Sequence, residues 1–331
     1  MKFSAIRFPI DKIRKVYYLL NKPYIRIIIL ILLFIFSFFY LENQYDEIVI
    51  IIQATEIKKN NIFIALFLIL LTVFQGTLTW RAILSWLNFK KPWGESAKGY
   101  AISSLAKYIP GFIWQYTGRV YFSHELSIPI KVIGYAIIAE FFLSILDGAI
   151  IACFSYFLSD LQYFQHSYFN LIITAILILF ILALVLLPRI FQKVFNKSED
   201  ENKIFLIKYY YLSILFNISG WILMSFSYWL IVSSLEIPKI PFISAMFMHS
   251  ASFVAGSVAL PVPNGLVIRE AVLALLNNNI INDNFFILSS IIFRILILLG
   301  EIIFTSILLS IQFIRSRNGH YQDFPSKDSQ N

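Results

Sequence analysis

Six long apolar stretches constrain this 331-residue chain more than any other feature. Each approaches or exceeds the roughly 20 residues that a helix needs to cross the hydrocarbon core of a bilayer. Backbone N–H and C=O groups in that core must find partners within the protein, which helices of this length provide. Hydrophobic residues make up 59% of the chain and charged residues 14%, and the mean hydropathy is +0.74. The sequence therefore predicts an all-α, polytopic integral membrane bundle, with helices at about 24–41, 62–84, 132–158, 168–187, 209–233 and 285–313.

Two proline–glycine segments, here called the elbows, interrupt this pattern. Pro110 and Gly111 form the first elbow, and Pro263 and Gly265 form the second. The flanking apolar stretches are mostly too short for a full crossing, which favours re-entrant hairpins. Two further crossings in each unit would also fit, so we expect about six to eight membrane helices. The flanking stretches are 96–109, 112–126, 242–260 and 266–276.

The spacing after each elbow indicates a duplicated unit. Ionisable residues follow the elbow glycines at the same two distances, 29 and 36 positions: Glu140 and Asp147 after Gly111, and Arg294 and Glu301 after Gly265. The intervening helices place the first elbow on the cytoplasmic side and the second on the outer side. Two similar units that enter the membrane from opposite faces form an inverted repeat, as in many secondary transporters.

The basic residues set the expected topology. The net charge of +8 comes from Lys and Arg in short loops, which follows the positive-inside rule and does not indicate nucleic-acid binding. Both termini and the 188–208 loop are expected in the cytoplasm, and the 42–61 loop outside. We divide the chain into a basic N-terminal segment (1–23), one transmembrane domain (24–315) and a polar, disordered tail (316–331). The N-terminal segment is either an interfacial helix or a topology signal alone, and no cleavable signal is evident.

Charged residues within the apolar stretches are the first candidates for function. Glu140, Ser144 and Asp147 are spaced by four and three, so they share one helical face. A charge at mid-membrane costs about 2.5–3.5 kcal/mol on insertion scales, so such residues mark structural ion pairs or a substrate pathway. Glu140 and Arg294 occupy equivalent positions in the two units with opposite charge. They either pair with each other near the symmetry axis or each find a local partner.

Three charged residues follow the elbows within two turns: Arg119, Arg269 and Glu270. Guanidinium groups bind phosphate through two parallel hydrogen bonds, and the start of a half-helix exposes backbone N–H groups that favour an anion. A phosphate-bearing lipid head group would therefore suit these positions. The alternative is that each arginine caps backbone carbonyls freed by the elbow.

Signatures of catalysis and of metal binding are mostly missing. The chain has no phosphate-binding loop, no nucleophile-elbow motif and no zinc-protease motif, and its four histidines lack zinc-ligand spacing. Cys153 is the single cysteine, so no intramolecular disulfide forms. We expect no cofactor and no metal. The acidic pair Asp46 and Glu47 is the one weak indication of an enzyme, because membrane glycosyltransferases that use prenyl-linked donors often place a catalytic acid in such a loop.

The ordered set of motifs resembles the lysylphosphatidylglycerol synthase transmembrane, or flippase-like, family. The resemblance covers about residues 60–315 and rests on Lys107–Arg119, on Glu140 through Asp147, on Leu260–Glu270 and on Arg294 through Glu301. The second elbow departs from the family pattern, because Val267 stands where a second glycine is expected. The aminoacyl-transfer domain that some members carry has no counterpart here, so lipid lysylation is not implied.

The resemblance implies a bacterial or archaeal cytoplasmic-membrane protein whose partners are a membrane lipid or lipid-linked glycan and, in some members, enzymes of envelope glycan synthesis. We expect a translocase for an anionic or polyprenyl-linked lipid, with the phosphate held by Arg119 and Arg269 and the polar route lined by the four ionisable residues of the repeat. The alternatives are the prenyl-phosphate-dependent glycosyltransferase and a non-catalytic accessory protein of a polysaccharide assembly complex.

Overall fold

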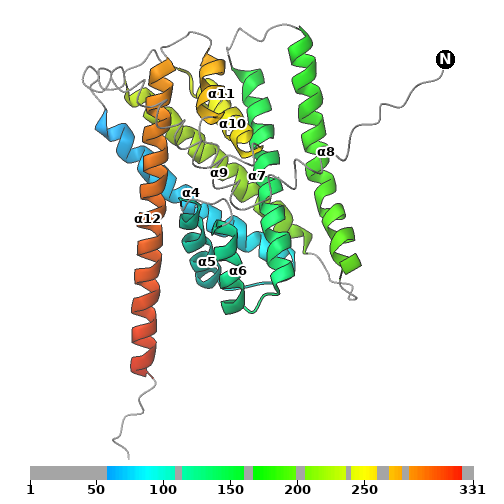
Figure 1. Cartoon of the computed structure of the whole chain (residues 1–331), viewed down its shortest axis with the longest axis vertical. Helices are drawn as coiled ribbons and strands as arrows, with labels where there is room; N and C mark the ends of the chain where they lie inside the picture. Colours follow the sequence, from blue (N-terminus) through cyan, green and yellow to red (C-terminus); the bar gives the residue numbers. More distant parts are fainter. Residues whose placement is uncertain are drawn as a thin grey trace, which may run out of the picture.

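The computed structural model describes residues 58–108, 114–159, 167–198, 206–235, 240–258, 268–277 and 283–322. These residues form nine α-helices and one short 3-10 helix, with no strand among them (Figure 1). The predicted helix at 24–41, the acidic pair Asp46 and Glu47, and all four elbow residues lie outside the described residues. The helices are α4 (Lys59–Trp86), α5 (Trp93–Leu105), η1 (Ala106–Tyr108), α6 (Trp114–Glu125), α7 (Ile130–Leu158), α8 (Ser167–Ser198), α9 (Ile207–Ser234), α10 (Phe242–Val258), α11 (Ile268–Asn277) and α12 (Asp283–Gln322).

Among the residues that the structure describes, five helices are long and apolar enough to cross a membrane: α4, α7, α8, α9 and α12. With a rise of 1.5 Å per residue, the 28-residue α4 is about 42 Å long, which exceeds the hydrocarbon thickness. Large apolar side chains such as Phe63 and Leu171 are exposed on the outside of the bundle, where lipid would cover them. The prediction of an all-α, multi-pass membrane bundle is confirmed.

Helices α4 and α9 form the central pair of the bundle and run antiparallel along their whole length. The Lys58 N–H donates to the Ser234 carbonyl at one end of the pair, and the Leu206 N–H donates to the Trp86 carbonyl at the other, both at 3.1 Å. In the middle Gly220 brings the helices together, because a Cβ at that position would lie 2.1 Å from a side-chain oxygen of α4. Small residues at such crossings allow the backbones of membrane helices to approach closely.

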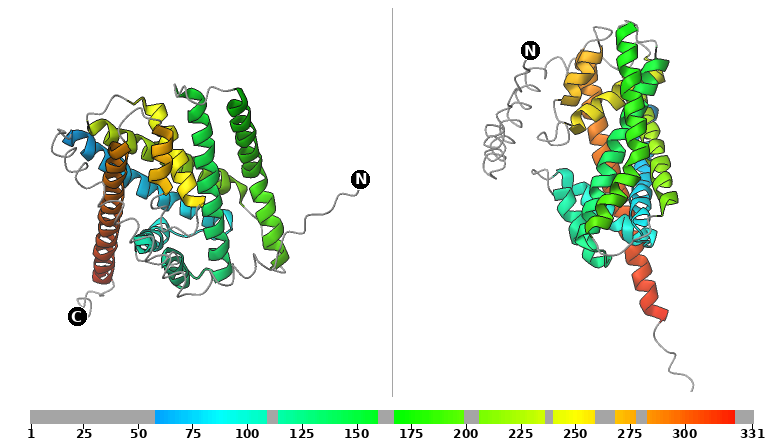
Figure 2. Two further views of the ribbon diagram at one scale, coloured as in Figure 1. Left: turned by 45° about the horizontal axis from the view of Figure 1, so that its top comes forward. Right: turned by 90° about the vertical axis from the view of Figure 1, so that its right-hand side faces the viewer.

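The remaining helices are arranged around this pair as two inverted halves. In the first half α4 runs down in the view of Figure 1, the short α5 and α6 lie at the lower end, and α7 runs up. In the second half α9 runs up, the short α10 and α11 lie at the upper end, and α12 runs down; the views of Figure 2 agree. The halves also interlock, since α7 packs against α10 and α12 packs against α5.

The short helices beside the elbows have the lengths that re-entrant hairpins require. Helices α5 and α6 contain 13 and 12 residues, and α10 and α11 contain 17 and 10, so each is about 15–26 Å long. The two helices of each pair pack against each other, α5 against α6 and α10 against α11, at one end of the bundle. The elbow geometry itself lies outside the described residues.

Helix α8 continues past the point where the sequence predicted its end. Pro188 lies inside this helix, although the predicted helix stopped at 187. A proline in a helix leaves the carbonyl four residues earlier without its usual donor. Here the Tyr210 hydroxyl of α9 donates a hydrogen bond of 2.5 Å to the Leu184 carbonyl. A side chain from α9 therefore replaces the backbone donor that α8 lacks at Pro188.

Helix α12 also extends further than expected. It reaches Gln322, inside the segment predicted to be a disordered tail from residue 316. Once a helix has formed, each added residue contributes one hydrogen bond, and no proline interrupts α12 before Pro325.

Candidate functional site

An ion pair between α6 and α7 begins the polar interior of the bundle. The Arg119 guanidinium donates to both carboxylate oxygens of Glu140, with Nη2 at 3.1 Å from Oε1. Aromatic rings of α4 and α5 surround the same guanidinium, since its centre lies 4.4 Å from the centroid of the Trp80 ring and 4.8 Å from that of Tyr100. Arg119 is only 6% exposed. A carboxylate therefore occupies the two-pronged face that was predicted to bind phosphate.

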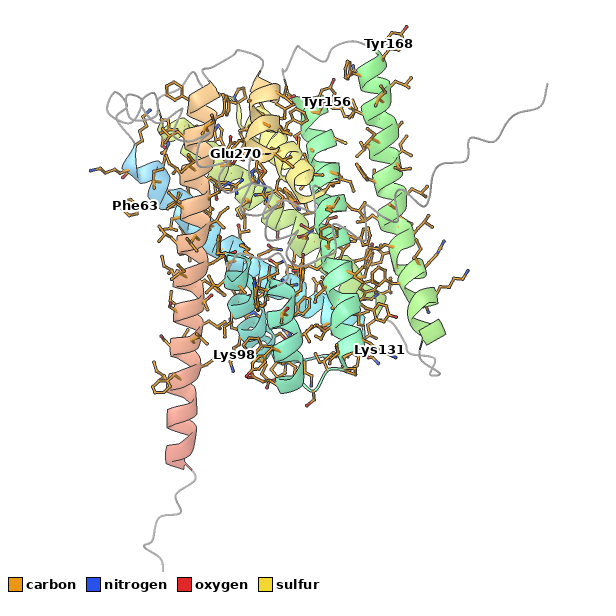
Figure 3. All side chains as sticks on the ribbon, in the orientation of Figure 1. Phe63, Lys98, Lys131, Tyr156, Tyr168 and Glu270 are labelled. Carbon is orange, nitrogen blue, oxygen red and sulfur yellow. The ribbon has the colours of Figure 1, made fainter. Side chains whose placement is uncertain are left out.

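The second half contains a corresponding pair with the charges exchanged. The Arg294 side chain of α12 donates to Glu270 Oε1 of α11 through Nη2 at 2.8 Å and Nε at 3.1 Å. The Ser290 hydroxyl donates to the same oxygen at 2.8 Å. Figure 3 shows Glu270 in the upper part of the bundle, whereas Lys98 marks the lower end. Of the two arrangements that the sequence left open for Glu140 and Arg294, the structure has the one in which each charge pairs locally.

A third ion pair joins the two halves. Lys107 lies in η1, just before the first elbow, and its Nζ donates to Glu301 Oε1 on α12. Glu301 is buried, and the Lys107 side chain is partly exposed. Arg294 and Glu301 are seven positions apart on α12 and have separate partners, as the spacing requires.

Asp147 is held by an amide and not by a cation in the described structure. Its Oδ2 accepts a hydrogen bond of 2.7 Å from Asn217 Nδ2 on α9, and the residue is 1% exposed. Its Oδ1 has no hydrogen-bond partner within the described chain. Asn217 was not singled out from the sequence, although an amide inside the apolar stretch 209–233 is a signal that could have identified it.

Arg269 lies in the interior of the second half. It is 8% exposed, and its guanidinium centre is 3.7 Å from the centroid of the Phe253 ring on α10. Contact with an aromatic face stabilises a buried cation electrostatically. The structure thus places Arg269 and Arg294 in the same small region.

Two cavities lie among these groups. The larger has an empty volume of about 620 Å³, which includes space open to the surroundings, and it lies between α4, α5, α7, α9 and α10. Glu140 and Ser144 line it, so two of the three residues predicted to share a face of α7 reach the same space. The smaller cavity has an empty volume of about 290 Å³, which also includes space open to the surroundings, and only about 20 Å³ of it can hold a water-sized group. It is lined by Arg269 and Arg294 among others.

His249 and Phe253 lie where the two cavities adjoin. Both residues are on α10, one turn apart, and both line both cavities. His249 is 4% exposed and stacks on Tyr228, with 5.4 Å between ring centroids. Its Nε2 has no hydrogen-bond partner among the described residues. Sequence reasoning missed His249, because it tested the histidines for metal-ligand spacing and not for burial.

Comparison with known proteins does not assign this arrangement to a family. No family model matches the chain, and a search of curated proteins finds no match to it. The resemblance to the flippase-like family stays a prediction from the motifs alone.

Proposed function

We propose that this protein is a membrane lipid translocase that moves an anionic phospholipid or a polyprenyl-linked lipid across the cytoplasmic membrane. The observation that carries the proposal is the pair of adjoining polar cavities inside a membrane bundle, the larger lined by Glu140 of the first half and the smaller by Arg269 and Arg294 of the second. Intramembrane charges that face a cavity are typical of transport pathways. The acyl or prenyl chain would stay in the bilayer while the head group passes through the two cavities.

The inverted halves supply the movement that such a pathway needs. Binding at the interface between inverted repeats, followed by closure of one side and opening of the other, is the usual mechanism of transporters built this way. A phosphate that enters the larger cavity would compete with Glu140 for the Arg119 fork, because carboxylate and phosphate accept the same pair of hydrogen bonds. Glu140 would then return to Arg119 when the phosphate leaves.

The distribution of lysines supports an orientation with the lower end of Figure 3 in the cytoplasm. Lys98 and Lys131 lie at that end, and Tyr156 and Tyr168 lie at the other. Basic residues flank membrane helices on the cytoplasmic side. The hairpin of α5 and α6 would then enter from the cytoplasm and that of α10 and α11 from the outside. The alternative glycosyltransferase depends on Asp46 and Glu47, outside the described residues, and is tested below.

The test combines transport with accessibility of one position. In a Cys153→Ser background, Thr72→Cys places a thiol in the larger cavity, and Leu71→Cys places one on the lipid-facing side of the same helix. A water-soluble thiol reagent is expected to label Thr72→Cys and not Leu71→Cys. In liposomes with a panel of labelled lipids, labelling should abolish translocation by the Thr72→Cys protein only. Translocation of no lipid by the unmodified protein, or unchanged transport after full labelling of Thr72→Cys, would contradict the proposal.

A further inference from the structure

Three long apolar helices turn polar side chains toward the larger cavity. On α4 these are Thr72, Gln75 and Thr79, whose spacing of three and four places them in one stripe along the helix. Ser144 of α7 and Asn217 of α9 face the same space. A polar side chain within a membrane helix costs free energy unless it hydrogen-bonds. The convergence of five such side chains on one space therefore indicates a site for a polar ligand.

The larger cavity has room for such a ligand, and the smaller one does not. About 160 Å³ of the larger cavity can hold a water-sized group, against about 20 Å³ of the smaller. A water needs roughly 10–15 Å³ on this measure, so the larger cavity admits on the order of ten waters and the smaller about one. The larger space is comparable to one sugar ring or a short polyol.

The walls of the larger cavity favour an uncharged ligand. Glu140 is the one charged side chain among the described residues that line it, and this carboxylate is already paired with Arg119. A charged group in the cavity can gain an opposite charge only by displacing one partner of that ion pair. An uncharged group leaves the pair intact, and the hydroxyl and carboxamide side chains of the wall match it.

The hydrogen-bonding capacity that the wall leaves unused favours a ligand that donates. Gln75 Nε2 donates to the Thr79 hydroxyl at 2.7 Å, and Asn217 Nδ2 donates to Asp147 at 2.7 Å. These bonds use the N–H groups and leave the carboxamide oxygens as acceptors. The Thr72 hydroxyl likewise donates to a carbonyl of its own helix at 2.9 Å, which leaves its oxygen to accept. Such acceptors match the O–H groups of a hydroxyl-rich ligand.

His249 supplies an independent observation. It lines the larger cavity, is 4% exposed, and its Nε2 has no hydrogen-bond partner in the described part of the chain. A buried polar atom without a partner destabilises the protein, and a hydroxyl group satisfies either imidazole tautomer because it both donates and accepts. The rings of Trp221 and Phe253 lie 6.0 and 5.9 Å from the His249 ring and line the same cavity. They provide apolar surface for the C–H groups of the ligand.

We propose that the larger cavity binds an uncharged, hydroxyl-rich head group. Its O–H groups donate to the acceptors of α4 and α9 and hydrogen-bond with His249 Nε2, and its C–H groups pack on the aromatic rings. This inference rests on the proposed function for the identity of the ligand as part of a lipid. The head group is either a sugar or the polyol of a glycerolipid. Both share the chemistry that the cavity selects, and the test separates them.

The test measures protection of one thiol, with the full chain in lipid nanodiscs. In the Cys153→Ser background Thr72→Cys places a thiol in the larger cavity, and a ligand bound there slows its reaction with a water-soluble thiol reagent. Hexyl glucoside carries a sugar, 1-O-hexyl glycerol a polyol, hexyl cyclohexyl ether a ring without hydroxyls, and hexylammonium a cation. We expect at least one hydroxyl-bearing ligand to protect the thiol at an about tenfold lower concentration than the ether or the ammonium. Whichever hydroxyl-bearing ligand protects at the lower concentration identifies the source of the head group.

Two variants assign this selectivity to the cavity wall. His249→Phe keeps an aromatic ring and removes the buried Nε2, so it should reduce the preference for hydroxyl-bearing ligands about threefold to tenfold in a protein that still folds. Ser144→Ala removes a hydroxyl from the same wall and should reduce the preference in the same direction. The matched control is Ser155→Ala, which removes a buried hydroxyl of the same helix that bonds to a carbonyl of α7 away from the cavity, and it should leave the preference unchanged.

Four results would overturn the inference. They are protection by the ether or the ammonium equal to that by the hydroxyl-bearing ligands, protection by no ligand, a full preference in the His249→Phe protein, and a Thr72→Cys thiol that does not react, because a cavity closed to the reagent is also closed to a sugar. Lipid movement in liposomes is measured separately. Selective protection without lipid movement would refute the translocase alone, and lipid movement without protection would refute this inference alone.

Discussion

Replacing Glu140 with glutamine tests whether the interior charge of the first half stabilises the fold. The change keeps the shape of the side chain and strands the Arg119 guanidinium, which is 6% exposed. Removing one partner of a buried ion pair costs about 3–5 kcal/mol. The Glu140 side chain is 20% exposed, and a glutamine oxygen still accepts one hydrogen bond, so we expect about 3 kcal/mol, the lower end of that range.

The double variant Arg119→Gln, Glu140→Gln should be more stable than this single variant. With both charges gone no unpaired ion stays buried, and the remaining loss is the stacking of the guanidinium on two aromatic rings, about 1–2 kcal/mol. A double-mutant cycle separates these contributions. The matched control is Glu125→Gln, which breaks the partly exposed pair with Lys98 (3.0 Å) and should cost less than about 1 kcal/mol.

The free energy of unfolding of each variant is measured at equilibrium in mixed micelles, where titration with a denaturing detergent unfolds the protein. Two results would refute the reasoning: a Glu140→Gln protein as stable as Glu125→Gln, or a double variant no more stable than the single one. Lipid movement measured on the same preparations then shows whether Glu140 also serves the pathway, which would reduce transport in a protein that stays folded.

Three further predictions concern topology, catalysis and the contact between the halves. In intact cells with the native cysteine replaced, a membrane-impermeant thiol reagent should label Asn43→Cys from outside and leave Ser198→Cys protected; the reverse pattern would reject the predicted orientation, with both termini in the cytoplasm. The double change Asp46→Asn, Glu47→Gln should leave function nearly intact, and loss of function at normal protein level would favour the glycosyltransferase. Lys107→Gln breaks the ion pair between the halves, so labelling of cysteines in the larger cavity should rise; unchanged labelling would show that this pair does not hold the bundle closed.

The helices and their repeat were predictable from the sequence because both depend on local signals. Apolar length fixes a membrane helix, and the equal spacing after the two elbows predicted the inverted halves that the structure shows. The Pro188 boundary was not predictable locally. The carbonyl of Leu184 is satisfied by Tyr210, which comes from another helix, so the tertiary contact decides whether the helix continues.

The partners of the buried charges were only partly predictable. Equivalence in the repeat placed Glu140 and Arg294 at matching positions, but equivalence under a two-fold axis does not by itself bring two residues into contact. Each pairs instead with a residue of the short helix that precedes its own helix in the sequence: Glu140 with Arg119 of α6, and Arg294 with Glu270 of α11. The amides and the histidine of the interior were missed, since one polar residue in an apolar stretch has little effect on the hydropathy that defines the helix.

The two halves are not equivalent in how they hold each other, and the sequence shows why. A shift of 154 residues relates Gly111 to Gly265, and it relates Glu301 to Asp147. Glu301 of the second half forms an ion pair with Lys107 of the first half. The position in the second half that is equivalent to Lys107 is Pro261, which carries no charge and cannot pair with Asp147 in the same way. Asp147 accordingly accepts a hydrogen bond from Asn217 instead.

This difference bears on which end of the bundle opens more easily. In the proposed translocase, opening at the lower end would require the hairpin of α5 and α6 to leave α12, which would break the ion pair between Lys107 and Glu301 and expose a buried carboxylate. Opening at the upper end would require the hairpin of α10 and α11 to leave α7, against which α10 packs. The pair between Glu270 and Arg294 stays within its own half in either movement. In the proposed translocase, opening of the lower end would therefore cost the ion pair between Lys107 and Glu301, and removing Lys107 should lower that cost.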